Sequence, residues 1–263
     1  MSATHLRVTA IQSDLAWHDA PANRQRFEKL LQPLAGLTDL IVLPEMFTTG
    51  FTMAAEQVAE SANGPTVDWL RKMAASANAT ITGSIVTQED NHYFNRLIWM
   101  RPDGTHASYD KRHLFRMAQE HQHFAAGHER IVVDIDGWKI CPLVCYDLRF
   151  PVWSRNRLGT AGGYDVLIYV ANWPERRRYA WQTLLRARAI ENLSYCVGVN
   201  RVGRDGQGID YKGDSAVIDF LGQPLTEASE DEFVATVPLE RAALDSFRAK
   251  FPAHLDADAF DVK

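Results

Sequence analysis

The chain alternates between runs of apolar residues and amphipathic stretches, the order expected of strands and helices in turn. Residues 6–11 predict a first strand. Four apolar residues then recur at helical spacing: Phe27, Leu30, Leu31 and Leu34. A second strand is expected at 40–43, a helix after Pro65 and a third strand at 80–86. The first third of the chain is therefore predicted to fold as βαβαβ.

Hairpins dominate the middle of the chain. Residues 97–100 precede the turn sequence Pro102-Asp103-Gly104. The runs 131–135 and 138–145 flank Asp136-Gly137, another turn-forming pair. Such turns join antiparallel strands, so we expect antiparallel pairs mixed into the sheet.

The second half returns to strands and helices in alternation. We expect a helix after Pro151 and another whose apolar face is formed by Trp181, Leu184, Leu185 and Ile190. Strands are expected at 165–170, 195–202, 215–220 and 233–237. Pro238 is predicted to begin a short helix over 239–247. With no linker between the halves, the pattern predicts a single α/β domain over residues 1–263, in which two mixed sheets pack face to face with helices outside.

Composition narrows the class of protein. The 263 residues are 46% hydrophobic and 23% charged, which is typical of a globular domain and excludes a disordered chain. A net charge of −5 offers no basic face for nucleic acid, so we expect no nucleic-acid partner. The apolar runs are too short to span a membrane and no signal peptide is recognisable. With only three cysteines, these features predict a cytoplasmic protein with no membrane partner.

Three reactive side chains follow predicted strands, where a sheet can position them and a loop can expose them. Glu45 follows the run 40–43, Cys145 ends the run 138–145, and Lys111 follows a short segment at 106–109. A thiol becomes nucleophilic as the thiolate, which a nearby base or ammonium makes available. The alternative is that these residues are a buried cysteine, a turn glutamate and a surface lysine.

Other clusters support weaker hypotheses. A metal site could be imagined from His113, His128 and the segment Glu120-His121-Gln122-His123, but no helical HExxH spacing supports it, and we expect no metal. Residues 203–208 contain several glycines but precede no helix, so a hairpin loop is expected there. The run Arg176-Arg177-Arg178 leaves a role in anion binding open.

Three motifs identify a family. Leu43-Pro44-Glu45, Tyr109-Asp110-Lys111 and the segment from Cys145 to Pro151, CYDLRFP, resemble the signatures of the nitrilase (carbon–nitrogen hydrolase) superfamily, in its order. The segments Ala171-Asn172-Trp173-Pro174 and 211–215 resemble its bacterial omega-amidase branch. The resemblance implies a four-layer α-β-β-α sandwich with two mixed sheets, assembled as a homodimer.

The resemblance also assigns catalytic roles. It implies that Cys145 is the nucleophile, Glu45 the general base and Lys111 the oxyanion-binding cation. We expect the backbone N–H of Tyr146 to help hold the oxyanion. A second glutamate of the family corresponds best to Glu120, although Ala126 stands where relatives often have proline and leaves Glu129 as a competitor. Such chemistry requires no cofactor.

The omega-amidase resemblance implies a small-molecule substrate, a monoamide of a short dicarboxylic acid such as 2-oxoglutaramate or succinamate. Its free carboxylate must be met by a cation or by backbone donors, and Arg176 or Arg177 is the candidate cation. Phe47 and Trp173 are expected to form apolar walls. Two alternatives stay open: another hydrolase of the superfamily, namely an N-carbamoyl-amine hydrolase, an aliphatic amidase or a nitrilase, and a non-catalytic dimeric binding protein that keeps the fold.

Overall fold

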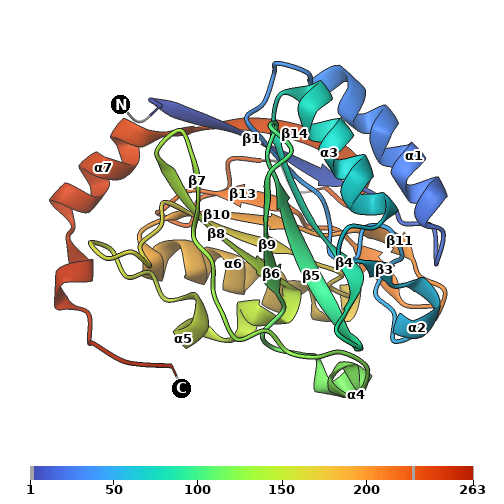
Figure 1. The fold of residues 1–263 in the computed structure, drawn as a ribbon. Coiled ribbons are helices and arrows are strands. Elements are labelled where there is room, and N and C mark those ends of the chain that lie inside the picture. The colour runs from blue at the N-terminus through green and yellow to red at the C-terminus, as the bar shows by residue number, and fades with distance from the viewer. Residues whose placement is uncertain (1–2, 227–228, 263) are drawn as a thin grey trace.

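Two mixed β-sheets form the centre of the computed structural model, which describes residues 3–226 and 229–262 (Figure 1). The first sheet has the spatial order β14 (Phe233–Glu240), β1 (His5–Gln12), β2 (Leu40–Val42), β4 (Thr80–Glu89), β5 (His92–Met100) and β6 (His106–Asp110), with β3 (Glu60–Ser61) paired to β4. Its strands β1, β2 and β4 are parallel, whereas β14, β5 and β6 each pair antiparallel with their neighbours. The antiparallel strands predicted from the hairpin turns therefore lie beside the parallel strands at the centre of this sheet.

The second sheet has a parallel centre as well. Its spatial order is β13 (Ala216–Ile218), β10 (Tyr195–Val199), β9 (Val166–Val170), β8 (Trp138–Val144) and β7 (Val133–Ile135). Strands β8, β9 and β10 run parallel, and β7 and β13 flank them antiparallel. A separate hairpin joins β11 (Val202–Arg204) to β12 (Asp210–Lys212), where a hairpin loop was predicted.

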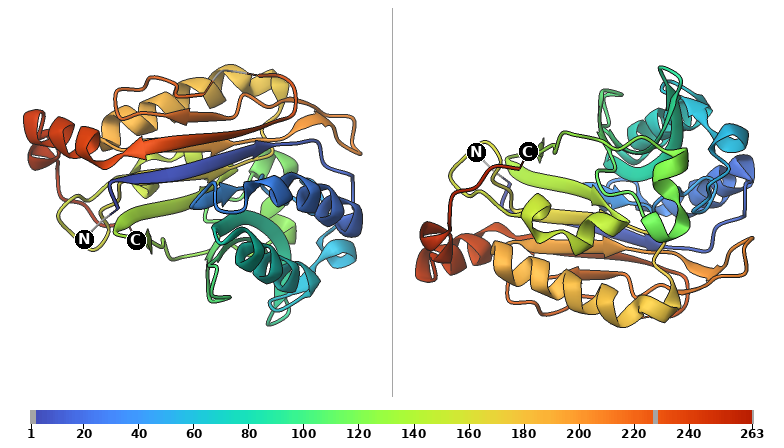
Figure 2. Two further views of the ribbon diagram at one scale, coloured as in Figure 1. Left: turned by 90° about the horizontal axis from the view of Figure 1, so that it is seen from above. Right: turned by 90° about the horizontal axis from the view of Figure 1, so that it is seen from below.

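Helices cover both outer faces, as the views from above and below show (Figure 2). The first sheet carries α1 (Ala20–Leu31) and α3 (Pro65–Ala77), and the second carries α6 (Arg178–Asn192). Near the carboxyl end, α7 (Arg241–Lys250) follows β14. The shorter helical elements are η1 (Gln32–Leu34), α2 (Ala55–Val58), η2 (Arg116–Ala118), α4 (Glu120–His123), η3 (Cys145–Arg149), α5 (Pro151–Ser154), η4 (Glu175–Arg177) and η5 (Ala253–Asp256). The layered sandwich predicted from the sequence is confirmed.

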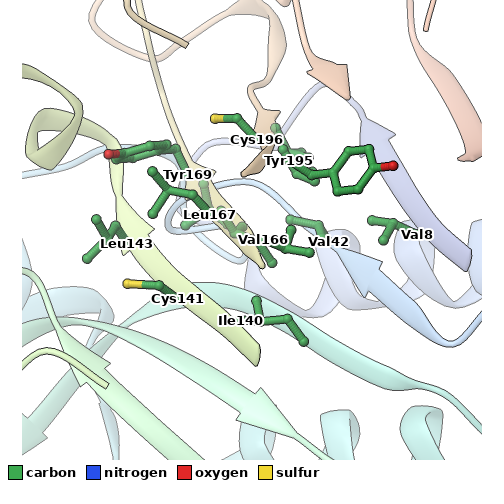
Figure 3. Packing of buried hydrophobic residues seen from close by; sticks show 14 of the residues in the cluster. Val8, Val42, Ile140, Cys141, Leu143, Val166, Leu167, Tyr169, Tyr195 and Cys196 are labelled. Atoms are coloured by element: carbon green, nitrogen blue, oxygen red, sulfur yellow. The ribbon is translucent and has the colours of Figure 1, made fainter. Parts of the chain in front are cut away.

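The alternation of side chains along each strand separates two cores. Leu40 and Val42 face the second sheet, whereas Ile41 between them packs with residues of α1 and α3. The core between the sheets joins Val42 to Ile140 and Val166 of the second sheet (Figure 3). The central strands β2, β9 and β10 are buried on both faces, and their sequences are therefore apolar runs without alternating polar residues.

The boundary at Pro238 differs from the prediction. Pro238 lies inside β14, opposite Arg7 of β1, and the helix begins only at Arg241. A proline has no N–H to give to a sheet, but β14 lies at the sheet edge, and Arg7 opposite Pro238 directs its own N–H and carbonyl to Asp39 on its other side. The ladder between β1 and β14 therefore does not need the missing N–H. In the described part of the chain, no helix is long and apolar enough to cross a membrane.

Candidate active site

The carboxyl ends of four strands bring the candidate residues together at one end of the sandwich. In the first sheet, Glu45 lies three residues beyond β2 and Lys111 follows β6 directly. In the second sheet, Cys145 follows β8 directly and Asn172 lies two residues beyond β9. Because β2 and β6 point the same way, as do β8 and β9, their ends can face one another across the interface between the sheets.

Lys111 connects two carboxylates. Its Nζ donates to Oε1 of Glu45 at 2.9 Å and to both carboxylate oxygens of Glu120 at 3.0 Å. The side chains of the two glutamates are fully buried and that of Lys111 is 1% exposed. Charged groups in such a place are tolerated when they are paired and hydrogen-bonded, and all three are.

Backbone and amide groups fix the carboxylate of Glu45. Its Oε1 accepts a second hydrogen bond from Nδ2 of Asn95 at 2.8 Å, and its Oε2 accepts one from the backbone N–H of Asn172 at 2.8 Å. The side-chain amide of Asn172 donates in turn to the backbone carbonyl of Glu45. Glu45 is thus tied to both sheets, with its carboxylate held in one orientation.

Glu120 is held by the segment that leads to it from Lys111. The backbone N–H of Phe115 donates to its Oε2 at 2.5 Å, and Nδ2 of Asn95 lies 3.3 Å from its Oε1. The carboxylate of Glu120 therefore binds the ammonium of Lys111 rather than the thiol of Cys145. Its place in the structure is that of a group that orients Lys111.

Cys145 sits at a sharp turn between β8 and η3. Its φ of 44° lies in the left-handed region, which non-glycine residues seldom adopt. The carboxylate of Asp147 stabilises this turn by accepting hydrogen bonds from the backbone N–H of Val144 at 3.0 Å and from the hydroxyl of Tyr109 at 2.7 Å. Such strain is typical of functional sites, because the surrounding structure must hold it in place.

The thiol is buried but faces a cavity. Cys145 is 8% exposed, and its Sγ lies 3.9 Å from the carbonyl oxygen of Asn172. Burial raises the pKa of the thiol well above its ordinary value, and the charge of Glu45 raises it further, while Lys111 lowers it. The sulfur is therefore protonated at rest, and a base must remove its proton before it can attack.

The pKa values of Lys111 and Glu120 each depend on the charge of the other residue. Burial lowers the pKa of Lys111, but the carboxylates of Glu120 and Glu45 outweigh this effect and the net shift is upward. Burial raises the pKa of Glu120, Lys111 lowers it and Glu45 raises it, with a net upward shift. Lys111 is thus a permanent ammonium beside the sulfur.

A cavity of about 240 Å³ opens onto Cys145. Its volume suits a small molecule rather than a polymer. Aromatic walls come from Phe51, Phe115, Trp173 and Tyr211, and cationic side chains come from Arg149, Arg176 and Arg177. Lys111 and Tyr146 also line it, so the sulfur, the ammonium and the residue with the expected oxyanion N–H all face one small space.

Comparisons with known proteins identify the family of the chain. The family model described as carbon-nitrogen hydrolase matches residues 7–249. The chain belongs to the carbon–nitrogen hydrolase family. Its likeness to a protein of known structure extends this result to the fold: a CN-hydrolase superfamily protein of Xanthomonas campestris, XC1258, is 52% identical and superposes with a TM-score of 0.97 over 99% of this chain and 100% of that one. The nitrilase-like α-β-β-α sandwich is thereby confirmed.

Curated relatives of this carbon–nitrogen hydrolase carry more specific names. Omega-amidase YafV of Escherichia coli (strain K12) is 49% identical over 97% of this chain and 98% of its own length. The 2-oxoglutaramate amidase of Bacillus subtilis (strain 168) is 30% identical over 95% and 96%. The crystal structure of XC1258 contains an arsenic adduct in that protein's active site.

Six residues predicted from the sequence line the cavity of this carbon–nitrogen hydrolase: Lys111, Cys145, Tyr146, Trp173, Arg176 and Arg177. Glu45 and Glu120 are not among the lining residues and are bonded to Lys111 instead. Phe47 does not line the cavity; it is fully buried in the other core, where its ring meets those of Phe27 and Trp69, and Phe51 supplies the wall instead. Glu129, the competitor of Glu120, is exposed. Among residues 3–226 and 229–262, no group of three His, Cys, Asp or Glu side chains could hold a metal ion.

Several contributors to the site received no role from the sequence. Asn95 bridges Glu45 and Glu120 from the middle of β5, and Asn172 holds Glu45 from the second sheet. Asn172 stands in a motif of the resemblance, ANWP, and its position after a predicted strand was the signal available. Asn95 carried no such signal, because it lies inside a strand.

Proposed function

We propose that this carbon–nitrogen hydrolase is an omega-amidase, which hydrolyses the terminal amide of short dicarboxylic acid monoamides to the carboxylate and ammonia. Substrates of this class are 2-oxoglutaramate and succinamate. The observation that carries the proposal is the Glu45–Lys111 pair beside Cys145 at the base of a small cavity with three arginines around it. The activities after which the Escherichia coli and Bacillus subtilis relatives are named support the substrate class.

Acylation is the first half of the reaction. Glu45 accepts the proton of the Cys145 thiol, and the sulfur forms a bond to the amide carbon as the carbonyl π electrons move to oxygen. The ammonium of Lys111 and the backbone N–H of Tyr146 stabilise this oxyanion. When the tetrahedral intermediate collapses, the C–N bond breaks, the nitrogen takes the proton from Glu45 and ammonia leaves. A thioester on Cys145 remains.

Hydrolysis of the thioester is the second half. Glu45 takes a proton from a water molecule, whose oxygen attacks the thioester carbon, and the same two donors hold the oxyanion. The C–S bond then breaks and the sulfur recovers its proton from Glu45. Because Glu120 holds Lys111 without contacting the sulfur, it acts as a positioning residue that keeps the ammonium charged.

The test is ammonia release from 2-oxoglutaramate and from succinamate by the purified protein. We expect release by the wild type and none by Cys145→Ala. N-carbamoyl-β-alanine and a simple nitrile distinguish the other branches of the family, because preferred turnover of either would overturn the omega-amidase assignment. A non-catalytic binding protein would bind the amides without releasing ammonia and without forming a thioester on Cys145.

We further propose a homodimer, a cytoplasmic location and a single domain over residues 1–263. The free state of all three cysteines agrees with a reducing compartment. Exposed apolar side chains on and near α6, among them Tyr179 and Ile190, are 80% and 50% exposed and offer a surface for a second copy. Light scattering of the purified protein as it elutes from a size-exclusion column gives its molar mass and tests the dimer. A monomer at micromolar concentration would refute it.

A further inference from the structure

Arg177 is a cation at the cavity wall, and its backbone is held in place by a hydrogen bond. It closes η4, and its backbone carbonyl accepts a hydrogen bond from Nε1 of Trp173 at 2.9 Å. Trp173 lies one residue beyond Asn172, which binds Glu45, so this hydrogen bond connects Arg177 to the frame of the active site.

The guanidinium of Arg177 has unused hydrogen-bonding capacity. It lies over the ring of Phe115 at 5.2 Å, and its Nη2 contacts the sulfur of Met117 at 2.8 Å. Its Nη1 is inaccessible to solvent and has no hydrogen-bond partner among residues 3–226 and 229–262. A buried N–H without an acceptor is costly, so this atom favours a ligand that brings one.

No acidic side chain in the described part of the chain forms an ion pair with Arg177, in contrast to the arginine that follows it. Arg178 pairs with Asp214 at 2.8 Å and with Glu230 at 2.7 Å. Burial lowers the pKa of Arg177, and the charges of Arg176 and Arg149 lower it further. Its surroundings thus concentrate positive charge that nothing in the described chain neutralises.

The other two arginines of the cavity are placed differently. Arg176 and Arg149 are both exposed, and the guanidinium of Arg149 stacks on the ring of Trp173 at 5.0 Å. Exposed cations at a cavity mouth attract anions from solution but hold them weakly, because water screens the interaction. Arg177 alone among the three combines partial burial with an unsatisfied N–H.

We propose that Arg177 is the residue that binds the free carboxylate of the amide substrate. The amide carbonyl then lies at Cys145 and the carboxylate at Arg177, which lines the same cavity, and the planar fork of the guanidinium matches a carboxylate in geometry. This assignment rests on the proposed omega-amidase function and names the group that selects acidic amides over neutral ones. It also separates Arg177 from Arg176, which the sequence left as equal candidates.

The experiment compares two amides of similar length, succinamate and butyramide, which differ in the carboxylate. Initial rates of ammonia release give kcat/KM for each with the wild type, Arg177→Gln and Arg177→Lys. The matched control is Arg116→Gln, which removes one exposed positive charge from the same segment as Phe115 without touching the cavity lining. Thermal unfolding of each variant reports whether it is folded.

We expect Arg177→Gln to lower kcat/KM for succinamate roughly 10- to 150-fold, the range of a charged hydrogen bond, and to leave kcat/KM for butyramide within about twofold. Arg177→Lys should recover part of the loss, and Arg116→Gln should match the wild type on both amides. An equal loss on both amides, or an unchanged preference in Arg177→Gln, would overturn the assignment. A wild type that hydrolyses neither amide would instead refute the proposed function.

Discussion

Replacing Lys111 with methionine removes the one cation from a buried group of charges. Its ammonium lies 2.9 Å from Glu45 and 3.0 Å from Glu120, and both carboxylates are fully buried. Removing one partner of a buried ion pair typically costs about 3–5 kcal/mol, because the remaining charge is left uncompensated. For a chain of this length, that loss lowers the melting temperature by about 5–9 °C.

The loss should depend on pH in a direction set by the pKa of Glu120. Burial raises this pKa above its ordinary value of 4.5, and Lys111 opposes the shift, so the pKa rises further without the ammonium. A carboxyl group whose pKa is higher in the folded than in the unfolded state binds more protons when folded. Stability therefore falls as the pH rises from the unfolded pKa towards the folded one. We expect Lys111→Met to be destabilised more at pH 8 than at pH 5.

The assay is urea unfolding at both pH values, with ammonia release measured alongside. Lys29→Met, a change at an exposed lysine, controls for the loss of a surface charge. The double variant Lys111→Met/Glu120→Gln should be more stable than Lys111→Met at pH 8, because one uncompensated charge is gone. Activity should stay about 10²- to 10³-fold below the wild type in both, since the oxyanion donor is missing. Wild-type stability of Lys111→Met at pH 8, or no gain in the double variant, would refute the reasoning.

Three further predictions concern the sulfur and the core. Cys145→Ala should abolish ammonia release while keeping the wild-type melting temperature within a few degrees; residual release at the wild-type rate would remove the thioester from the mechanism. Iodoacetamide should label Cys145 before Cys141 and Cys196, because Cys145 faces the cavity and is 8% exposed, while the other two thiols are fully buried away from it. Peptide mass spectrometry checks the order, and equal labelling would contradict it. Gly198→Ala should cost about 1–3 kcal/mol in urea unfolding, because its Cβ would lie 2.5 Å from the Leu185 side chain; the cost should shrink in a Leu185→Ala background.

The layers of the sandwich could be predicted because the apolar residues recur with a clear strand or helix spacing in most segments. The strand at 40–43 and the helix after Pro65 follow directly from such runs, and the structure has β2 and α3 there. The sequence was less informative about Pro238, because whether a strand tolerates proline depends on its neighbours in the sheet. The neighbours of a strand are set by the tertiary structure, and the local sequence around Pro238 does not reveal them.

The same distinction applies to the active site. Glu45, Lys111 and Cys145 were recognisable because each follows a strand within a motif. Phe47 was predicted as a wall of the cavity, but Met46 between it and Glu45 has a φ of 42°, and the chain changes direction there. Phe47 enters the core as a result, and Phe51 reaches the cavity.

The hydrogen bonds of Lys111 have a consequence for the timing of the reaction. An ammonium group carries three N–H bonds, and at Lys111 all of them are directed at carboxylate oxygens. The oxygen of a bound amide can gain one of these N–H bonds only when a carboxylate releases it. In the proposed mechanism Glu45 becomes a neutral acid when it takes the thiol proton, and a neutral acid is a weaker acceptor than a carboxylate. Formation of the nucleophile would therefore free an N–H of Lys111 for the carbonyl oxygen of the substrate, which links the activation of the two reactants.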